Sequence, residues 1–140
     1  MISKWDNIQH FNKKENWGNP DKINPFLLLV MDIIRDRCGM KIKIHCGYER
    51  TGHATKSQHY KGNACDWHFD TDISFRKQYF ILDNVLETTF IGDVKLGDLI
   101  GLGVYPNWNN QGFHSDCRGY RARWMQDTDG EYKQIRIAAL

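Results

Sequence analysis

The sequence predicts an α+β fold, because stretches with helical and with strand periodicity alternate along a chain that has no linker, repeat or low-complexity tract. Apolar residues recur every three or four positions over 25–38 and 74–88, which predicts two helices. Apolar and polar residues alternate over 41–46 and 64–69, which predicts two half-buried strands. We therefore expect a single domain over 1–140, in which a mainly antiparallel sheet is flanked by helices.

The first helix has clear signals at both ends. Asn24 provides a side-chain cap, Pro25 suits the first turn, and Gly39 follows the last apolar position. The strand that follows divides its side chains between two faces, with Ile42, Ile44 and Cys46 on one and Lys41, Lys43 and His45 on the other.

The strand over 64–69 shows the same alternation. Its larger apolar side chains are expected to face the core, so that Asp66 and His68 share the opposite face. Further strands are expected over 99–105 and 113–117, joined by a turn over 106–112. The last expected element is a hairpin over 121–137 that turns at Asp129 and Gly130, and the strand before it places His114 and Asp116 on one face.

Composition excludes several classes of protein and partner. With 41% hydrophobic and 26% charged residues, a chain of 140 residues can close a core without metal or disulfide staples. The net charge of +2 arises from interspersed signs, so we expect no nucleic-acid partner. The longest apolar run, Phe26 to Met31, is too short to cross a bilayer. The four cysteines form no CxxC pair and are expected to be reduced, structural thiols.

Two segments place a histidine near a carboxylate. The first, 57–66, contains His59 and Asp66, and the second, 112–116, contains His114 and Asp116. Two imidazoles and one carboxylate suit an open tetrahedral zinc site with one position left for water. Spacing alone leaves the alternative open that these histidines are ordinary loop or core residues.

The pattern Ser57-x-His59-x-x-Gly62-x-Ala64-x-Asp66, followed by His114-x-Asp116, resembles the SxHxxGxAxD and HxD signature of the zinc D-Ala-D-Ala carboxypeptidase and L,D-endopeptidase family. Phage endolysins are among the members of this family. The similarity covers roughly residues 20 to 120 and includes a Gly-Tyr pair at Gly47. It implies a Hedgehog/DD-peptidase-like fold.

The resemblance also implies roles for single residues. His59, Asp66 and His114 would hold one Zn²⁺ ion, and Ser57 would lie beside the bound peptide. In the family an arginine near the Gly-Tyr segment contacts the substrate. Here the arginine is displaced by one position to Arg50, which could equally be part of a solvated loop pair.

The position of the general base departs from the family pattern. Many relatives carry an acid three residues before the second histidine, where this chain has Gln111, and an amide accepts no proton at neutral pH. Asp116 is the nearest candidate to replace it, although it could instead fix the tautomer of a histidine. His68 is a candidate proton shuttle or a partly exposed strand residue. Among the aromatic residues, Tyr105 and Trp108 are the candidate walls of a substrate groove.

These observations predict a monomeric zinc metallopeptidase that hydrolyses a peptide bond in the stem or cross-link of bacterial peptidoglycan and is encoded by a phage or prophage. The polar stretch from Met1 to Asn19 does not read as a signal peptide. We expect synthesis in the bacterial cytoplasm, followed by holin release or action as part of a virion, with no insertion into the membrane. The alternative is a zinc-containing peptidoglycan-binding module of the same fold with weak or no catalysis.

Overall fold

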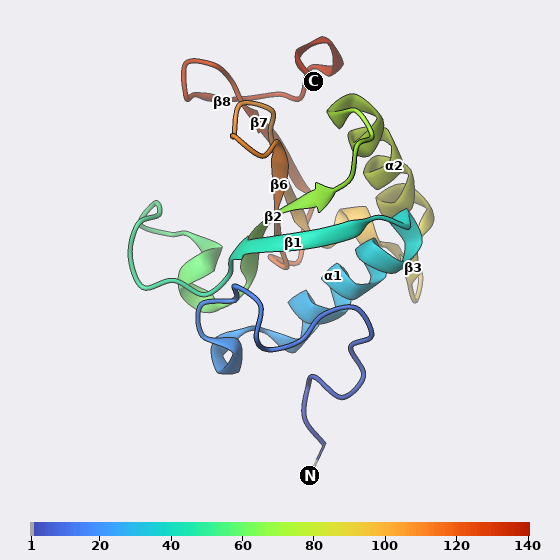
Figure 1. The fold of residues 1–140 in the computed structure, drawn as a ribbon, viewed down its shortest axis with the longest axis vertical. Helices are drawn as coiled ribbons and strands as arrows, with labels where there is room; N and C mark the ends of the chain where they lie inside the picture. Colours follow the sequence, from blue (N-terminus) through green and yellow to red (C-terminus); the bar gives the residue numbers. More distant parts are fainter. Residues whose placement is uncertain (1) are drawn as a thin grey trace.

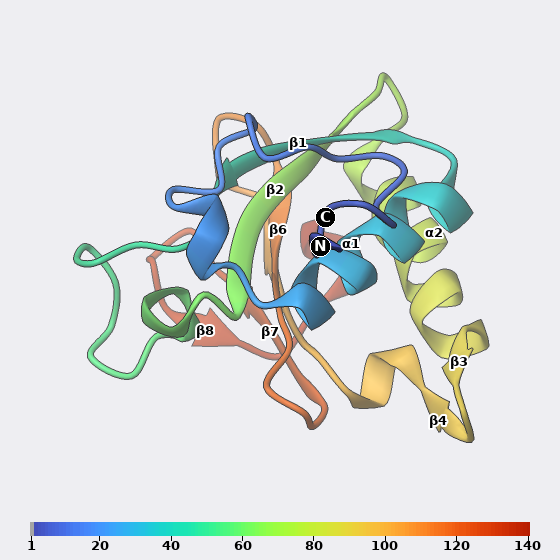
Figure 2. The same ribbon diagram turned by 90° about the horizontal axis from the view of Figure 1, so that it is seen from below.

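The structure is a computed structural model that describes residues 2–140. A six-stranded sheet has both helices on one face, and the long connection between β1 and β2 lies on the other (Figures 1 and 2). The strand order is β1-β2-β6-β5-β7-β8, and every neighbouring pair is antiparallel except β5 and β7. The elements are α1 (Pro25–Cys38), β1 (Lys41–Cys46), β2 (Ala64–Asp70), α2 (Phe75–Thr88), β3 (Phe90–Ile91), β4 (Val94–Lys95), β5 (Gly101–Tyr105), β6 (Gly112–Asp116), β7 (Ala122–Gln126) and β8 (Tyr132–Lys133), with 3-10 helices η1 (Pro20–Lys22), η2 (Gln58–Lys61), η3 (Leu96–Asp98) and η4 (Ile137–Ala139).

Both helices begin and end where their capping residues allow. The Asn24 side chain accepts a hydrogen bond from the Phe26 N–H at 2.8 Å, and Gly39 ends α1 in the left-handed region with φ of 69°. The Ser74 hydroxyl accepts a hydrogen bond from the N–H of Lys77 at the start of α2. The expected α+β class and the predominance of antiparallel pairing are confirmed.

The sheet contains two features that the sequence pattern did not predict. The hairpin of β3 and β4 has only two residues in each strand, which is too short for an alternating pattern to be recognised. The second is the parallel pairing of β7 with β5, which places Trp124 level with Gly103. Because β6 already occupies the other edge of β5, the chain after β6 crosses to the free edge and runs parallel there.

A β-bulge in β1 corrects the expected orientation of Cys46. Ile44 pairs with Trp67, but Cys46 and not His45 pairs with Asp66, so that one extra residue is inserted in β1. Ile44 therefore faces the core, whereas Cys46 lies on the same face as Asp66. The strict alternation that grouped Cys46 with Ile44 was wrong, because the bulge interrupts the two-residue period.

The core lies between the sheet and the two helices. Trp67 and Phe113 are fully buried there, and the Trp67 indole N–H donates a hydrogen bond to the Ser115 hydroxyl at 2.9 Å. No helix in the described part of the chain is long and apolar enough to span a membrane.

The segment before α1 also belongs to the core and supports the loops on the other face of the sheet. Trp17 is fully buried, and its carbonyl accepts a hydrogen bond from the Tyr48 N–H at 2.8 Å. The Asn24 N–H donates to the Gly62 carbonyl at 2.9 Å. The N-terminal segment thus holds both ends of the connection between β1 and β2.

Candidate metal centre

Pairing of β2 with β6 places the two central residues of the site side by side. Asp66 and His114 are directly opposite each other in the antiparallel register, so their side chains leave the same face of the sheet. The same row continues to Gly103 in β5 and Trp124 in β7. Gly103 has no side chain, and a Cβ atom there would lie 2.6 Å from the Trp124 indole nitrogen. The missing side chain lets this indole lie across β5 toward His114.

The short helix η2 carries His59 to the same row. Ser57 caps this helix by accepting a hydrogen bond from the His59 N–H at 3.2 Å. Gly62 ends it in the left-handed region, with φ of 72°. A Cβ atom on Gly62 would lie 1.8 Å from the Lys22 carbonyl oxygen, so only glycine fits this close approach.

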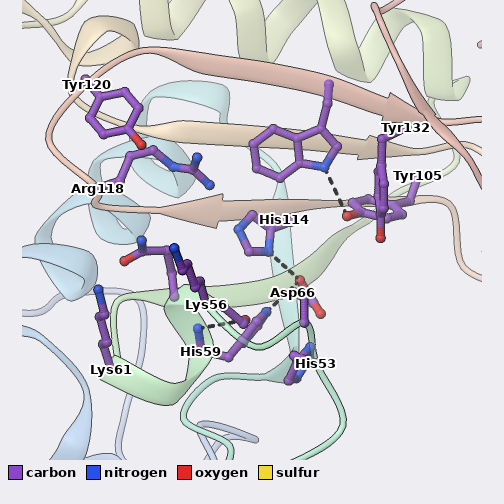
Figure 3. A pocket seen from close by; sticks show the side chains of 14 residues that line it. His53, Lys56, His59, Lys61, Asp66, Tyr105, His114, Arg118, Tyr120 and Tyr132 are labelled. Carbon is purple, nitrogen blue, oxygen red and sulfur yellow. Dashed lines mark hydrogen bonds and ion pairs between the residues drawn. The ribbon is translucent and has the colours of Figure 1, made fainter.

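The three side chains converge on one carboxylate oxygen (Figure 3). His59 Nε2 lies 3.3 Å and His114 Nδ1 lies 3.0 Å from Asp66 Oδ1. One potential ligand atom from each residue lies within 4.8 Å of the other two, as a metal site requires. His59 is 2% exposed and His114 is 8% exposed, so both rings are fixed by their surroundings.

In both His59 and His114, the ring nitrogen that points away from Asp66 has a hydrogen-bond acceptor as its partner, and this acceptor determines which nitrogen carries the proton. His59 Nδ1 donates to the Gly47 carbonyl oxygen at 2.8 Å, because a carbonyl can only accept a hydrogen bond. His114 Nε2 lies 2.7 Å from Asp116 Oδ2 and donates to this carboxylate. In the neutral rings, a lone pair then remains on each of the two nitrogens that face Asp66. Two lone pairs and a carboxylate facing one another fit a divalent cation.

The carboxylate of Asp116 is fully buried and is held from several directions. Arg118 donates to it from both Nε and Nη2, each at 2.7 Å, and the Gly101 N–H donates at 3.2 Å. Burial alone would raise the pKa of Asp116, but the hydrogen bonds from Arg118 and His114 hold the pKa well below its ordinary value. Asp116 therefore remains an acceptor for His114.

Neighbouring charges also shift the pKa values of Asp66 and His114. Burial raises the pKa of Asp66, but its hydrogen bonds with His114 and His59 lower the pKa by more. Burial lowers the pKa of His114, and its two carboxylate partners raise the pKa above its ordinary value. The arrangement thus favours an ionised Asp66 facing positive charge, whether this charge is a proton or a metal ion.

The candidate centre opens into a pocket of about 640 Å³. Besides the three residues that converge there, Lys56, Lys61 and Arg118 bring positive charge to its wall, and aromatic side chains form much of the remainder. Asp66 is the one carboxylate among the described residues that line this pocket. A second pocket of about 350 Å³ adjoins it, because Asp66 lines both.

The other residues that the sequence analysis proposed for substrate binding or catalysis do not all lie in the larger pocket. Ser57 and Tyr105 line the larger pocket, whereas Trp108 stacks on Tyr105 at 4.2 Å and lines the second pocket. Arg50 is exposed in the loop after β1 and lines neither pocket. Gln111 is also exposed, and its side chain donates to the Pro106 carbonyl oxygen at 2.9 Å.

His68 lies outside the larger pocket. Its Nδ1 atom forms a hydrogen bond with Nε2 of His45 in the neighbouring strand. Burial lowers the pKa of His68, and the adjacent His45 ring lowers it further. His68 is therefore placed away from the three converging side chains, on the side of the second pocket.

Three neighbours of the centre were missed by sequence reasoning. Cys46 donates to Asp66 Oδ2 at 3.3 Å, and the bulge that places it there has no pattern in the sequence. His53 stacks on His59 at 4.0 Å, and a loop histidine carries no periodic signal. Of the three, the sequence could have indicated Arg118, because an arginine two residues after a buried strand aspartate can form an ion pair with that aspartate.

Comparison of this chain with protein families, with curated proteins and with solved structures finds no match. The candidate metal group of His59, Asp66 and His114 therefore stands on its geometry alone.

Proposed function

We propose that this protein is a zinc-dependent peptidase that hydrolyses a peptide bond in bacterial peptidoglycan. The observation that carries the proposal is the convergence of His59 Nε2 and His114 Nδ1 on Asp66 Oδ1. The opposite ring nitrogens are already bound, so both free lone pairs are directed at one point. Two histidines and one carboxylate leave room for water and substrate on zinc, as in catalytic rather than structural sites.

Each group of residues has a distinct part in this proposal. Bound zinc would polarise the scissile carbonyl and lower the pKa of a water molecule. His59, Asp66 and His114 hold the ion, and Asp116 fixes the orientation and tautomer of His114. Since Arg118 neutralises Asp116 and the whole carboxylate is buried, Asp116 is a positioning residue and not the proton acceptor.

The wall of the larger pocket suits an anionic peptide. Lys56 and Lys61 line the pocket and form no ion pair with any described carboxylate. Ser57 and Tyr105 add hydroxyl groups to the same wall. Peptidoglycan stem peptides carry free carboxylates, which two unpaired ammonium groups would attract. A volume of about 640 Å³ accommodates several peptide residues.

A second candidate function is a zinc-containing module that binds peptidoglycan with weak or no turnover. It is favoured by the shortage of free carboxylates: among the described residues that line the larger pocket, Asp66 is the one carboxylate, and in this proposal it is a metal ligand. Many members of the peptidase family that the sequence resembles carry an acid at the position of Gln111. Here the Gln111 side chain donates to a backbone carbonyl instead. The two functions share the metal and the pocket and differ in turnover.

One experiment separates them. Zinc-loaded protein is incubated with purified peptidoglycan, and the release of new amino groups is measured for the wild type, for His59→Ala and for His10→Ala. His10 pairs with Asp36 outside the site and serves as a matched control. Release that persists in His10→Ala and disappears in His59→Ala supports the peptidase. Zinc and peptidoglycan binding without release supports the module, and failure of the wild type to bind zinc contradicts both.

A further inference from the structure

Two histidines that the proposed centre does not use face each other across neighbouring strands. His45 is the extra residue of the bulge in β1, and His68 lies two positions after Asp66 in β2. Both side chains leave the face of the sheet that carries Asp66. Their Nε2 and Nδ1 atoms, respectively, are in hydrogen-bonding contact, so two potential metal-ligand atoms are already adjacent.

We propose that His45 Nε2 and His68 Nδ1 form a second metal site, which binds a divalent transition ion such as Zn²⁺ or Ni²⁺. Imidazole is the ligand that both ions share, and a pair of neutral rings on adjacent strands is a chelating arrangement. This site is distinct from the candidate centre, since it uses neither His59 nor His114.

The surroundings give such an ion space and solvent. The second pocket, of about 350 Å³, is lined by His45, Asp66, Trp108, Asn109 and Asn110. Water or the two amide side chains can therefore complete a coordination shell that contains two protein nitrogens. The site is open to solvent, which allows entry of the ion without unfolding.

Coordination requires only a small movement. Zinc lies about 2.0 to 2.1 Å from each histidine nitrogen, so a tetrahedral shell separates two nitrogens by roughly 3.3 Å. His45 is an exposed residue whose ring can turn to make this space, while His68 is half-buried and serves as the fixed ligand. The direct hydrogen bond between the rings is replaced by two bonds to the metal.

Charged side chains of both signs lie beside the pair. Lys43 is opposite His68 in the register, and Asp70 follows His68 by two positions on the same face. One repels a cation and the other attracts it. The ionised Asp66 also lines this pocket, but its oxygens are bound by His59, His114 and Cys46. With two protein ligands instead of three, we expect binding weaker than at the three-residue centre.

The structure provides a separate optical reporter for each site. The Trp108 ring lies 6.4 Å from the His45 ring, and the Trp124 ring lies 5.2 Å from the His114 ring. Ni²⁺ quenches the fluorescence of nearby indoles. Quenching that depends on Trp108 therefore reports on the second site, and quenching that depends on Trp124 reports on the first.

The test uses untagged, metal-free protein and no substrate, so its outcome is independent of peptidase activity. Isothermal titration with Zn²⁺ is expected to give two equivalents for the wild type, with the second bound more weakly. We expect one equivalent for His45→Ala, one for His59→Ala, and two for the control His10→Ala. His45 is exposed, so its replacement leaves the fold intact, and circular dichroism checks this.

A second measurement guards against an indirect effect of the substitution. Protein that holds one equivalent of Zn²⁺ is titrated with Ni²⁺, and a quenching phase is expected that is lost in Trp108→Phe and in His45→Ala but kept in Trp124→Phe. The proposal is overturned if His45→Ala still binds two ions, or if the wild type binds only one ion and that ion is lost in His59→Ala. The latter result leaves the proposed peptidase centre standing.

Discussion

Asp116 lies behind His114 and determines which of its ring nitrogens is free. The 2.7 Å contact between Asp116 Oδ2 and His114 Nε2 leaves Nδ1 directed at Asp66. Because the two residues are separated by one position in β6, their side chains share a face of the strand, and this contact follows directly from the HxD spacing. The same carboxylate is also bound by Arg118, so the orientation of the candidate ligand His114 depends on Asp116 directly and on Arg118 through it.

Replacing Asp116 by Asn is expected to weaken zinc binding by about 10- to 100-fold, because partners that orient a ligating histidine typically contribute this much. The amide cannot accept hydrogen bonds from both His114 and Arg118 as the carboxylate does. Zinc affinity is measured by competition with a chromogenic chelator. Asp98→Asn, which removes an exposed carboxylate bound to Arg121, is the control and should leave the affinity unchanged. Equal affinities for the two variants would contradict a positioning role of Asp116.

Replacing Arg118 by Ala is expected to lower the free energy of unfolding by about 3 kcal/mol. The Arg118 side chain is 21% exposed, but the Asp116 side chain is fully buried, so the substitution leaves a buried carboxylate without its main cationic partner. Urea denaturation of the metal-free protein measures the loss. Arg136→Ala removes an exposed ion pair with Asp127 and should cost much less, because solvent screens this pair. A loss no larger than this in Arg118→Ala would show that the pair contributes little.

Removal of metal is expected to lower the melting temperature of the wild type by more than that of His59→Ala. An ion that binds only the folded state stabilises it by about 4 kcal/mol at a concentration 1,000 times its Kd. His59 is almost fully buried and provides one of the converging nitrogens, so replacing it removes most of the stabilisation by the bound ion. Differential scanning calorimetry with zinc and with EDTA measures both shifts. An equal effect of EDTA on the two proteins would mean that the stabilising ion is bound elsewhere.

Much of the fold could be predicted because the local signals agree with one another. The helix predicted over 25–38 has the observed bounds, since Asn24 and Gly39 both act as the caps that their positions suggested. Similarly, the faces of β2 follow the expected alternation, with Trp67 buried and Asp66 on the other side. The convergence of His59, Asp66 and His114 agrees with the group that the motif resemblance singled out.

What the sequence did not reveal depends on contacts between distant segments. Cys46 reaches Asp66 through a bulge, and only the pairing with β2 shows that an extra residue is present. His53 reaches His59 because the Tyr60 hydroxyl donates to its carbonyl at 2.6 Å and accepts from its N–H at 2.8 Å. Neither contact has a period or a local propensity from which it could be inferred.

The half-buried thiols of Cys38 and Cys117 are expected to react slowly with alkylating agents in the folded protein. Burial raises the pKa of Cys38 to about 12 and that of Cys117 to about 11, so little thiolate is present at pH 8. Because the folded pKa values are raised, their contribution to stability is complete below pH 9 and is lost as the pH rises toward 11 to 12. Mass spectrometry after iodoacetamide treatment, with and without urea, measures the protection. Rapid labelling of Cys38 in the native protein at pH 8 would contradict it.

Gly62→Ala is expected to destabilise the protein and to weaken zinc binding together, because Gly62 joins η2 to β2 at a point where no Cβ atom fits. Gly39 provides a matched control, since its φ of 69° is close to the 72° of Gly62, but no atom lies within 4 Å of its hypothetical Cβ. The left-handed conformation alone costs about 1 to 2 kcal/mol for alanine, and this cost applies to both variants. In Gly62→Ala, the overlap with the Lys22 carbonyl oxygen adds to this cost and displaces η2, which carries His59. Urea denaturation and chelator competition on both variants measure the two effects, and zinc affinity should fall in Gly62→Ala alone. If both variants lose equal stability and neither loses affinity, the close approach at Gly62 does not position His59.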